Sequence, residues 1–161
     1  MIVVSNTSPI LNLAVIGRLN LIELLYKKVL IPQEVAAELS AILPEKFSKK
    51  ELQKLHYIET LSITNREVVN SLSLELDLGE AEAIALALEM KANLLLLDER
   101  RGRKVASRFG FRFIGLIGML VEAKRKGYIA ALKPVLNELI VKAGFWISDE
   151  LYSRVLHEVG E

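Results

Sequence analysis

The sequence predicts an α/β protein built around a mainly parallel sheet, and three observations support this prediction. Short, uninterrupted apolar stretches such as Met1–Ser5 and Leu94–Leu97 are typical of strands that are buried on both faces. Longer stretches with apolar residues at helical spacing lie between them. Strands that alternate with helices are expected to form a mainly parallel sheet covered by helices on both faces.

The N-terminal half begins with the strand Met1–Ser5, which is followed by a helix. Pro9 suits the first turn of that helix, and Ile10, Leu13 and Ala14 follow on one apolar stripe. The further elements expected in this half are the helix Leu19–Tyr26, the strand Val29–Ile31, the helix Gln33–Ser40, the strand Tyr57–Leu61 and the helix Glu67–Leu74. The polar, lysine-rich residues 41–54 are expected to form a loop or a loosely packed helix.

The clearest helix follows Asp77 and runs to Met90. Asp77 and Glu80 have the spacing of a capping box, so Glu80 is assigned to the cap and is not included in a site. The remaining elements expected are the strand Leu94–Leu97, the basic helix Arg101–Phe109 ended by Gly110, the strand Arg112–Ile114, and the helices Leu116–Lys126, Ile129–Ala143 and Ser148–Val159. No repeat or linker divides the chain, so residues 1–161 are expected to form a single domain.

Composition and charge limit the classes of protein and site. An apolar fraction of 52% in 161 residues is enough to form a core. Cysteine is absent, which excludes disulfides and thiolate metal ligands. The N-terminus lacks a basic region, and no apolar run approaches the roughly 20 residues that span a bilayer, so we expect a soluble, cytoplasmic protein. A net charge of +1 indicates a polyanion partner only if positive charge is concentrated locally.

Polar residues follow the predicted strands at positions that suit a metal site. Asn6 follows the first strand and Asp98 follows Leu94–Leu97, and the carboxyl ends of parallel strands meet at one edge of a sheet. Glu38 and Glu82, in the neighbouring helices, could join them. Two carboxylates about 4 Å apart repel by about 4 kcal/mol, which favours a bound cation. Oxygen ligands without cysteine favour Mg²⁺ or Mn²⁺, and such a site suits metal-activated water attacking a phosphodiester.

Each of these residues also has a purely structural interpretation. Asn6 can be the N-cap of the first helix, and Asp98 can cap the helix that follows it. Glu82 can share a solvated helix face with Glu89, and Glu38 can be an ordinary surface residue.

A cluster of cations follows Asp98 directly. It consists of Arg100, Arg101, Arg103, Lys104 and Arg108. Arg100, Lys104 and Arg108 are four residues apart and are expected to line one helix face. Beside a metal site, this face could bind phosphates, and elsewhere it would be a solvated face.

Other side chains give weaker signals. His56 and His157 lack metal-ligand spacing, and glycine-rich nucleotide motifs and the Gly-x-Ser-x-Gly motif are absent. The aromatic residues Phe145, Trp146 and Tyr152 are interpreted as core or interface residues rather than as a platform for stacking bases.

The predicted acids belong to a series of short motifs in a fixed order. The motifs are Val3–Pro9, Ile31–Leu39, Leu78–Ala87 and Leu94–Arg101, and the tail Gly144–Ser148 with Glu150–Tyr152 extends the pattern over nearly the whole chain. Together they resemble the PIN-domain family, in particular its branch of short proteins related to VapC-type toxins. The resemblance implies a three-layer α/β/α fold and an Mg²⁺- or Mn²⁺-dependent ribonuclease activity, a hydrolase reaction on phosphodiester bonds.

The resemblance also assigns roles to single residues. Glu38, Glu82 and Asp98 match the acids of the family, and Thr7 and Ser8 match small hydroxyl residues that support the site through hydrogen bonds. The family's leading Asp is replaced by Asn6, which offers a carbonyl oxygen but no charge, so metal affinity and cleavage should both be reduced. By analogy, the protein would be a homodimer restrained by a small antitoxin.

Two functions therefore remain open. The first is a metal-dependent endoribonuclease in which Arg100, Arg101, Arg103 and Lys104 steer the RNA backbone. The second is a catalytically weakened PIN-like module that binds RNA or a protein partner without efficient cleavage. A domain acting on a small molecule is less favoured because a phosphate-binding loop is missing.

Overall fold

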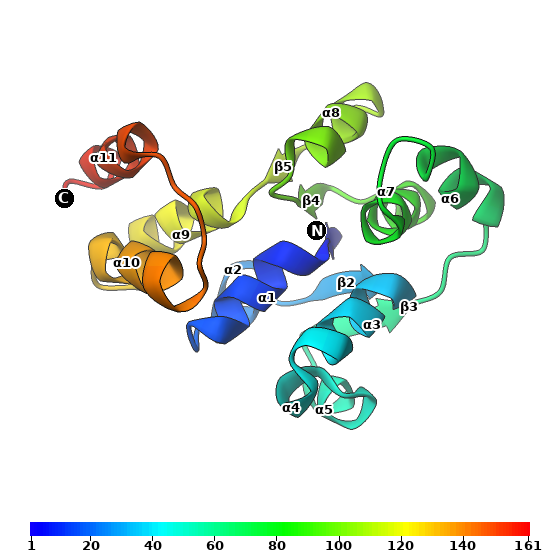
Figure 1. Cartoon of the computed structure of the whole chain (residues 1–161), viewed down its shortest axis with the longest axis horizontal. Coiled ribbons are helices and arrows are strands. Elements are labelled where there is room, and N and C mark those ends of the chain that lie inside the picture. The colour runs from blue at the N-terminus through cyan, green and yellow to red at the C-terminus, as the bar shows by residue number, and fades with distance from the viewer.

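A computed structural model describes all 161 residues and contains one five-stranded parallel sheet (Figure 1). Its strands are β1 (Val3–Ser5), β2 (Val29–Pro32), β3 (Ile58–Leu61), β4 (Leu94–Leu96) and β5 (Phe113–Ile114). Their order across the sheet is β3-β2-β1-β4-β5, and every neighbouring pair is parallel. The chain leaves β1 toward β2 and β3, and it returns to the other side of β1 with β4. The boundary between β1 and β4 is therefore the switch point of the sheet, where ligands bind in open α/β folds.

Eleven helices connect and cover the strands. They are α1 (Thr7–Val15), α2 (Asn20–Tyr26), α3 (Gln33–Ile42), α4 (Pro44–Phe47), α5 (Lys49–Lys54), α6 (Arg66–Leu72), α7 (Leu78–Met90), α8 (Arg100–Arg108), α9 (Leu116–Arg125), α10 (Leu132–Lys142) and α11 (Asp149–Glu158). None of them combines the length and the apolar character needed to cross a membrane.

The strands are buried on both faces, as their continuous apolar sequences predict. Successive side chains of a strand point to opposite faces, so Val3 and Leu96 join one core while Val4 and Leu95 join the other. The first core also takes apolar residues of α1, α2, α3, α9 and α10, and the second takes those of α6, α7 and α8. The sequence prediction of a three-layer α/β/α fold with a parallel sheet is confirmed.

Residues 41–54, expected to be a loop or a loosely packed helix, form the short helices α4 and α5. Phe47 is fully buried in the first core and fixes this segment to the fold. The first helix begins at Thr7, two residues before Pro9. Pro9 lies in its first turn, where a missing N–H costs no intrahelical hydrogen bond.

Candidate metal centre

The ends of β1 and β4 lie side by side, as predicted for Asn6 and Asp98. Ser5 pairs with Leu96 in the parallel ladder, and the Asn6 N–H donates to the Leu96 carbonyl at 3.1 Å. Asn6 is only 5% exposed. It occupies the N-cap position of α1, but its side chain makes no capping hydrogen bond. Capping therefore does not explain why a polar side chain stands at this point.

Asp98 is held by two donors from separate helices. Its Oδ2 accepts from Ser8 Oγ at 3.0 Å, and its Oδ1 accepts from the Leu116 N–H at 2.7 Å. Leu116 is the first residue of α9, so the carboxylate lies at the positive end of that helix. Asp98 thus caps α9 rather than α8, whose N-cap residue is Glu99.

Glu38 reaches from α3 to the start of α7. Its Oε2 accepts a hydrogen bond from Thr7 Oγ1. A Cβ atom on Gly79 would lie 2.7 Å from Glu38 Oε1, so a glycine is what permits this close approach. Burial raises the pKa of Glu38, and the charges of Asp77 and Glu99 add to this effect, while the Thr7 hydrogen bond opposes it. Glu38 therefore shares an electrostatic environment with acids that precede α7 and α8.

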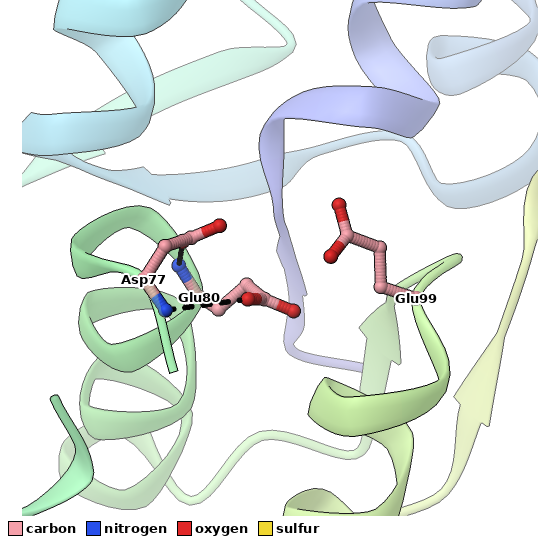
Figure 2. Close-up of side chains that lie close together, drawn as sticks. All are labelled: Asp77, Glu80 and Glu99. Atoms are coloured by element: carbon pink, nitrogen blue, oxygen red, sulfur yellow. Dashed lines mark hydrogen bonds between the residues drawn. The ribbon is translucent and has the colours of Figure 1, made fainter. Parts of the chain in front are cut away.

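Three further carboxylates form an acidic group next to Glu38. They belong to Asp77, Glu80 and Glu99, and one oxygen from each lies within 4.8 Å of the other two. Figure 2 shows Glu80 and Glu99 extending toward each other from α7 and from the segment before α8. The predicted capping box is present: Asp77 Oδ1 accepts from the Glu80 N–H at 2.8 Å, and Glu80 Oε1 accepts from the Asp77 N–H at 3.4 Å.

The capping box uses only one oxygen of the Glu80 side chain. The other, Oε2, is buried and has no hydrogen-bond partner. It lies against α8, where a Cβ atom on Gly102 would be 2.9 Å away. Burial and the neighbouring Asp77 and Glu99 raise the pKa of Glu80 to about 7. A buried carboxylate oxygen without a donor is costly, so this atom requires a proton or a cation.

Glu82, a predicted ligand, has other partners. It is 5% exposed, its Oε1 accepts from the Glu34 N–H at 3.1 Å, and its Oε2 accepts from Arg66 Nη1 at 3.0 Å. Glu82 and Glu89 do not share a solvated face, because Glu82 is buried, while the half-buried Glu89 accepts through Oε1 from the Thr64 N–H at 2.8 Å. Glu82 and Glu89 instead bind backbone N–H groups at or before the starts of α3 and α6, and Glu82 is not part of the acidic group.

The cations of α8 divide into two sets. Arg108 forms two hydrogen bonds, at 2.9 and 2.8 Å, with the Glu75 carboxylate, and Arg101 donates to the Glu75 carbonyl at 3.2 Å. Lys104 lines a small surface cavity together with Glu75, Arg101 and Arg108. The expected face of Arg100, Lys104 and Arg108 is therefore partly neutralised.

Arg103 lies on another side of α8, close to Asp98. Its Nε donates to the Leu97 carbonyl at 2.8 Å, and its guanidinium lies 5.2 Å from the centre of the Phe113 ring. A Cβ atom on Gly115 would contact both the Arg103 guanidinium and the Asp98 carboxylate. Arg103 thus lies next to Asp98, one of the predicted site acids.

Comparison with known proteins agrees with this geometry. A family model described as a PIN domain matches residues 2–161, and no curated protein matches the chain. The chain belongs to the PIN-domain family. Membership suggests a nuclease that interacts with nucleic acid, and PIN domains generally use divalent metals. The match supports the family as a whole and not a particular branch of it.

The residues of this PIN domain fit a divalent cation. Hard carboxylate oxygens are the ligands that Mg²⁺ and Mn²⁺ prefer, and Glu80 Oε2 supplies a buried acceptor that no donor satisfies. Sequence reasoning placed Glu38 in this region but left out Asp77, Glu80 and Glu99. The available signal was the capping box itself, because a glutamate that caps with one oxygen still has a second one.

Proposed function

We propose that this PIN domain is a divalent-metal-dependent endoribonuclease that uses Mg²⁺ or Mn²⁺. The observation that carries the proposal is the buried, unpartnered Oε2 of Glu80 within a group of three carboxylates. A group of this kind at the switch point of a parallel sheet, in a chain of the PIN family, is best explained as a site for a cation.

Glu80, Asp77 and Glu99 would hold the cation, with Glu38 beside them. When bound, the cation would lower the pKa of a water molecule and stabilise charge on the phosphodiester oxygens. Asn6 would offer its carbonyl oxygen from the end of β1. Asp98 would face the site in the orientation that Ser8 fixes.

The remaining predicted residues would support this arrangement. Thr7 holds the carboxylate of Glu38 through its hydroxyl. We assign Glu82 an indirect role, because it anchors the first turn of α3, the helix that carries Glu38. Arg100, Arg101, Arg103 and Lys104 would attract the RNA backbone, and Arg100 and Arg103 are not engaged by Glu75.

The proposal is tested by cleavage of a labelled single-stranded RNA with Mn²⁺. Glu80→Gln removes a ligand charge while keeping the shape of the side chain, and it should lower the rate by about 100-fold. Asp98→Asn should also lower the rate. Glu89→Gln is the matched control, because it changes an acid of the same helix outside the acidic group. Equal rates for the wild type and Glu80→Gln would contradict the proposal.

A second candidate is a PIN module that binds RNA or a protein partner without efficient cleavage. It is favoured by one observation, the neutral Asn6 at the end of β1. This candidate predicts RNA binding that weakens with salt and yields no metal-dependent products. Asn6→Asp separates the two: a sharp gain in cleavage indicates a weakened enzyme, and no gain indicates a dedicated binding module.

We also propose, from the resemblance to VapC-type proteins, that the chain is a homodimeric toxin held inactive by a small antitoxin. A neighbouring reading frame for a short protein supports this role if its product, when co-expressed, binds the chain and stops cleavage. The role is abandoned if expression of the wild-type chain does not arrest growth while the purified protein cleaves RNA.

A further inference from the structure

A large groove begins at Asp98, the residue before Glu99 of the acidic group, and runs along the C-terminal helices. Its volume is about 910 Å³, and it is lined by residues of β5, α9, α11 and the segment before α11. Asp98 and Arg103 lie among its lining residues, whereas Asp77, Glu80 and Glu99 do not, so Asp98 is the acid through which the groove reaches the end of β4. Figure 1 shows that α9 leads away from β5 toward α10 and α11. The groove therefore connects the acidic edge of the sheet with the C-terminal part of the chain.

Trp146 lines this groove and is 82% exposed. The sequence interpretation grouped it with Phe145 and Tyr152 as core or interface and not as a platform for stacking bases. Phe145 and Tyr152 are partly buried and pack against the first core, but Trp146 does not. An indole ring left in solvent at the wall of a groove presents a flat face on which a planar group can stack.

Four cations line the same groove. Arg125 forms an ion pair with Glu158 at 3.7 Å, and Lys126 forms one with Glu122 at 3.3 Å. The other two are Arg103, which lies close to Asp98, and the exposed Arg154 on α11. Neither guanidinium has a carboxylate partner within 4 Å. The unpaired cations thus lie on α8 and α11. An anion can therefore be attracted both to the part of the groove next to Asp98 and to the part on α11.

We propose that this groove holds a single strand of RNA, with one base stacked on Trp146 and a phosphate held by Arg154. The proposal rests on the proposed function insofar as the strand is the substrate that enters the metal centre. Continuity with Asp98, unpaired positive charge and an exposed aromatic ring together fit a strand with both phosphates and free base faces. A duplex is disfavoured because its bases are stacked on one another and cannot reach Trp146.

Trp146 is the only tryptophan of the chain, so its fluorescence reports directly on the groove. Titration of the full chain with oligouridylate in EDTA should quench this fluorescence without any cleavage. An oligomer of the same length with abasic sugars should bind more weakly and leave the fluorescence unchanged. Equal quenching by the abasic oligomer or by duplex RNA would overturn the stacking.

Affinity is measured with end-labelled oligouridylate by fluorescence anisotropy. Trp146→Ala should weaken binding by about 5- to 150-fold, and Trp146→Phe should restore most of the affinity. Phe109→Ala is the matched control: Phe109 is 47% exposed but lies outside the groove, so its removal should leave the affinity unchanged. Because both side chains are exposed, the variants should retain the wild-type circular dichroism.

The contribution of Arg154 is separated by salt dependence. Arg154→Gln should lower the slope of log affinity against log salt by about 0.7, the value for one phosphate contact on a single strand. Lys46→Gln is the control, because it removes an exposed charge from α4, outside the groove. An unchanged slope for Arg154→Gln, or equal slopes for both variants, would remove Arg154 from the RNA path.

Failure of the groove and failure of the nuclease give different results. RNA binding that needs Trp146, without metal-dependent cleavage, would support the RNA-binding groove and contradict the proposed nuclease activity. Cleavage that needs Glu80, with an RNA affinity that Trp146→Ala does not change, would support the nuclease activity and contradict RNA binding in the groove. A change of oligomeric state in Trp146→Ala, seen by light scattering without a change in RNA affinity, would show that this face contacts a second copy instead.

Discussion

At the scale of single residues, Glu80 is both a helix cap and a candidate metal ligand, although the sequence pattern indicates only the cap. Its Oε1 closes the capping box of α7, and its Oε2 stands without a donor beside Asp77 and Glu99. The cap fixes the backbone of Glu80, and Gly102 on the neighbouring helix leaves room for the second oxygen. A helix cap and a candidate metal ligand are therefore parts of the same side chain.

The pH dependence of stability tests the environment of Glu80. Its pKa rises from 4.5 to about 7, so the folded chain retains a proton that the unfolded chain releases between these values. Metal-free stability should thus fall as the pH rises from about 4.5 to 7, by up to about 3 kcal/mol. Glu80→Gln should flatten this part of the profile, as measured by urea unfolding in EDTA. A profile identical to that of the wild type would show that Glu80 is not buried as the structure describes.

Asn6→Asp tests the neutral position at the end of β1. The added carboxylate would be nearly buried without a cation, so the variant should be less stable than the wild type in EDTA. It should bind Mn²⁺ at least about tenfold more tightly, because each 1.4 kcal/mol of added attraction gives a factor of ten. Calorimetric titration measures this affinity, and Asn70→Asp, on the exposed face of α6, is the control. Equal gains in both variants would indicate a general charge effect.

At the scale of elements, carboxylates of α7 fix the starts of other segments. Glu82 accepts from the second residue of α3 and pairs with Arg66 at the start of α6, and Glu89 binds the backbone before α6. Negative side chains are favourable at these positive helix ends. The position of α3 matters for the site because α3 carries Glu38. Acids that resemble metal ligands in the sequence can therefore act through the helices that they hold.

Glu82→Ala distinguishes these two roles. It leaves the Glu34 N–H and Arg66 without their acceptor, so stability should fall by about 1–3 kcal/mol even in EDTA. Glu67→Ala, which removes an exposed acid of α6, should cost less than about 0.5 kcal/mol. Urea unfolding measures both changes. Unchanged stability of Glu82→Ala together with lost Mn²⁺ binding would make Glu82 a ligand after all.

At the scale of the whole molecule, the strand order brings distant segments to one edge. Because β1 lies between β2 and β4, the segments after these strands converge there, and α3 and α7 pack across the edge. The acidic group and Glu38 thus bring together side chains that are up to about 60 residues apart in the sequence, from Glu38 to Glu99. A cation at this point would join α3, α7 and α8.

Such a cation should stabilise the whole fold. At a Mn²⁺ concentration of 100 times the dissociation constant, the folded state gains about 2.7 kcal/mol by mass action. The thermal midpoint should therefore rise with Mn²⁺ in the wild type and in Glu89→Gln, but not in Glu80→Gln. The gain should grow as the pH rises through about 7, because protons then compete less for Glu80. An equal shift in all three proteins would indicate binding outside the acidic group.

The sequence alone determined the order of the strands and of the longer helices, the parallel sheet and the edge at which Asn6 and Asp98 stand. These features depend on local patterns: apolar runs give strands that are buried on both faces, and a polar residue after such a run lies at the carboxyl edge. The capping box of Asp77 and Glu80 was equally local and is confirmed. The resemblance to the PIN family followed from the same motifs, and the family match confirms it.

Only the tertiary structure decided which oxygens come together. Glu80 and Glu82 are two residues apart on a helix, so their side chains point about 200° apart, and the sequence does not tell which neighbour each one meets. That choice depends on Gly102 of α8, which leaves space beside Glu80, and on the N-terminus of α3, which engages Glu82. The exposed position of Trp146 has the same origin, because burial depends on which helix packs over a residue.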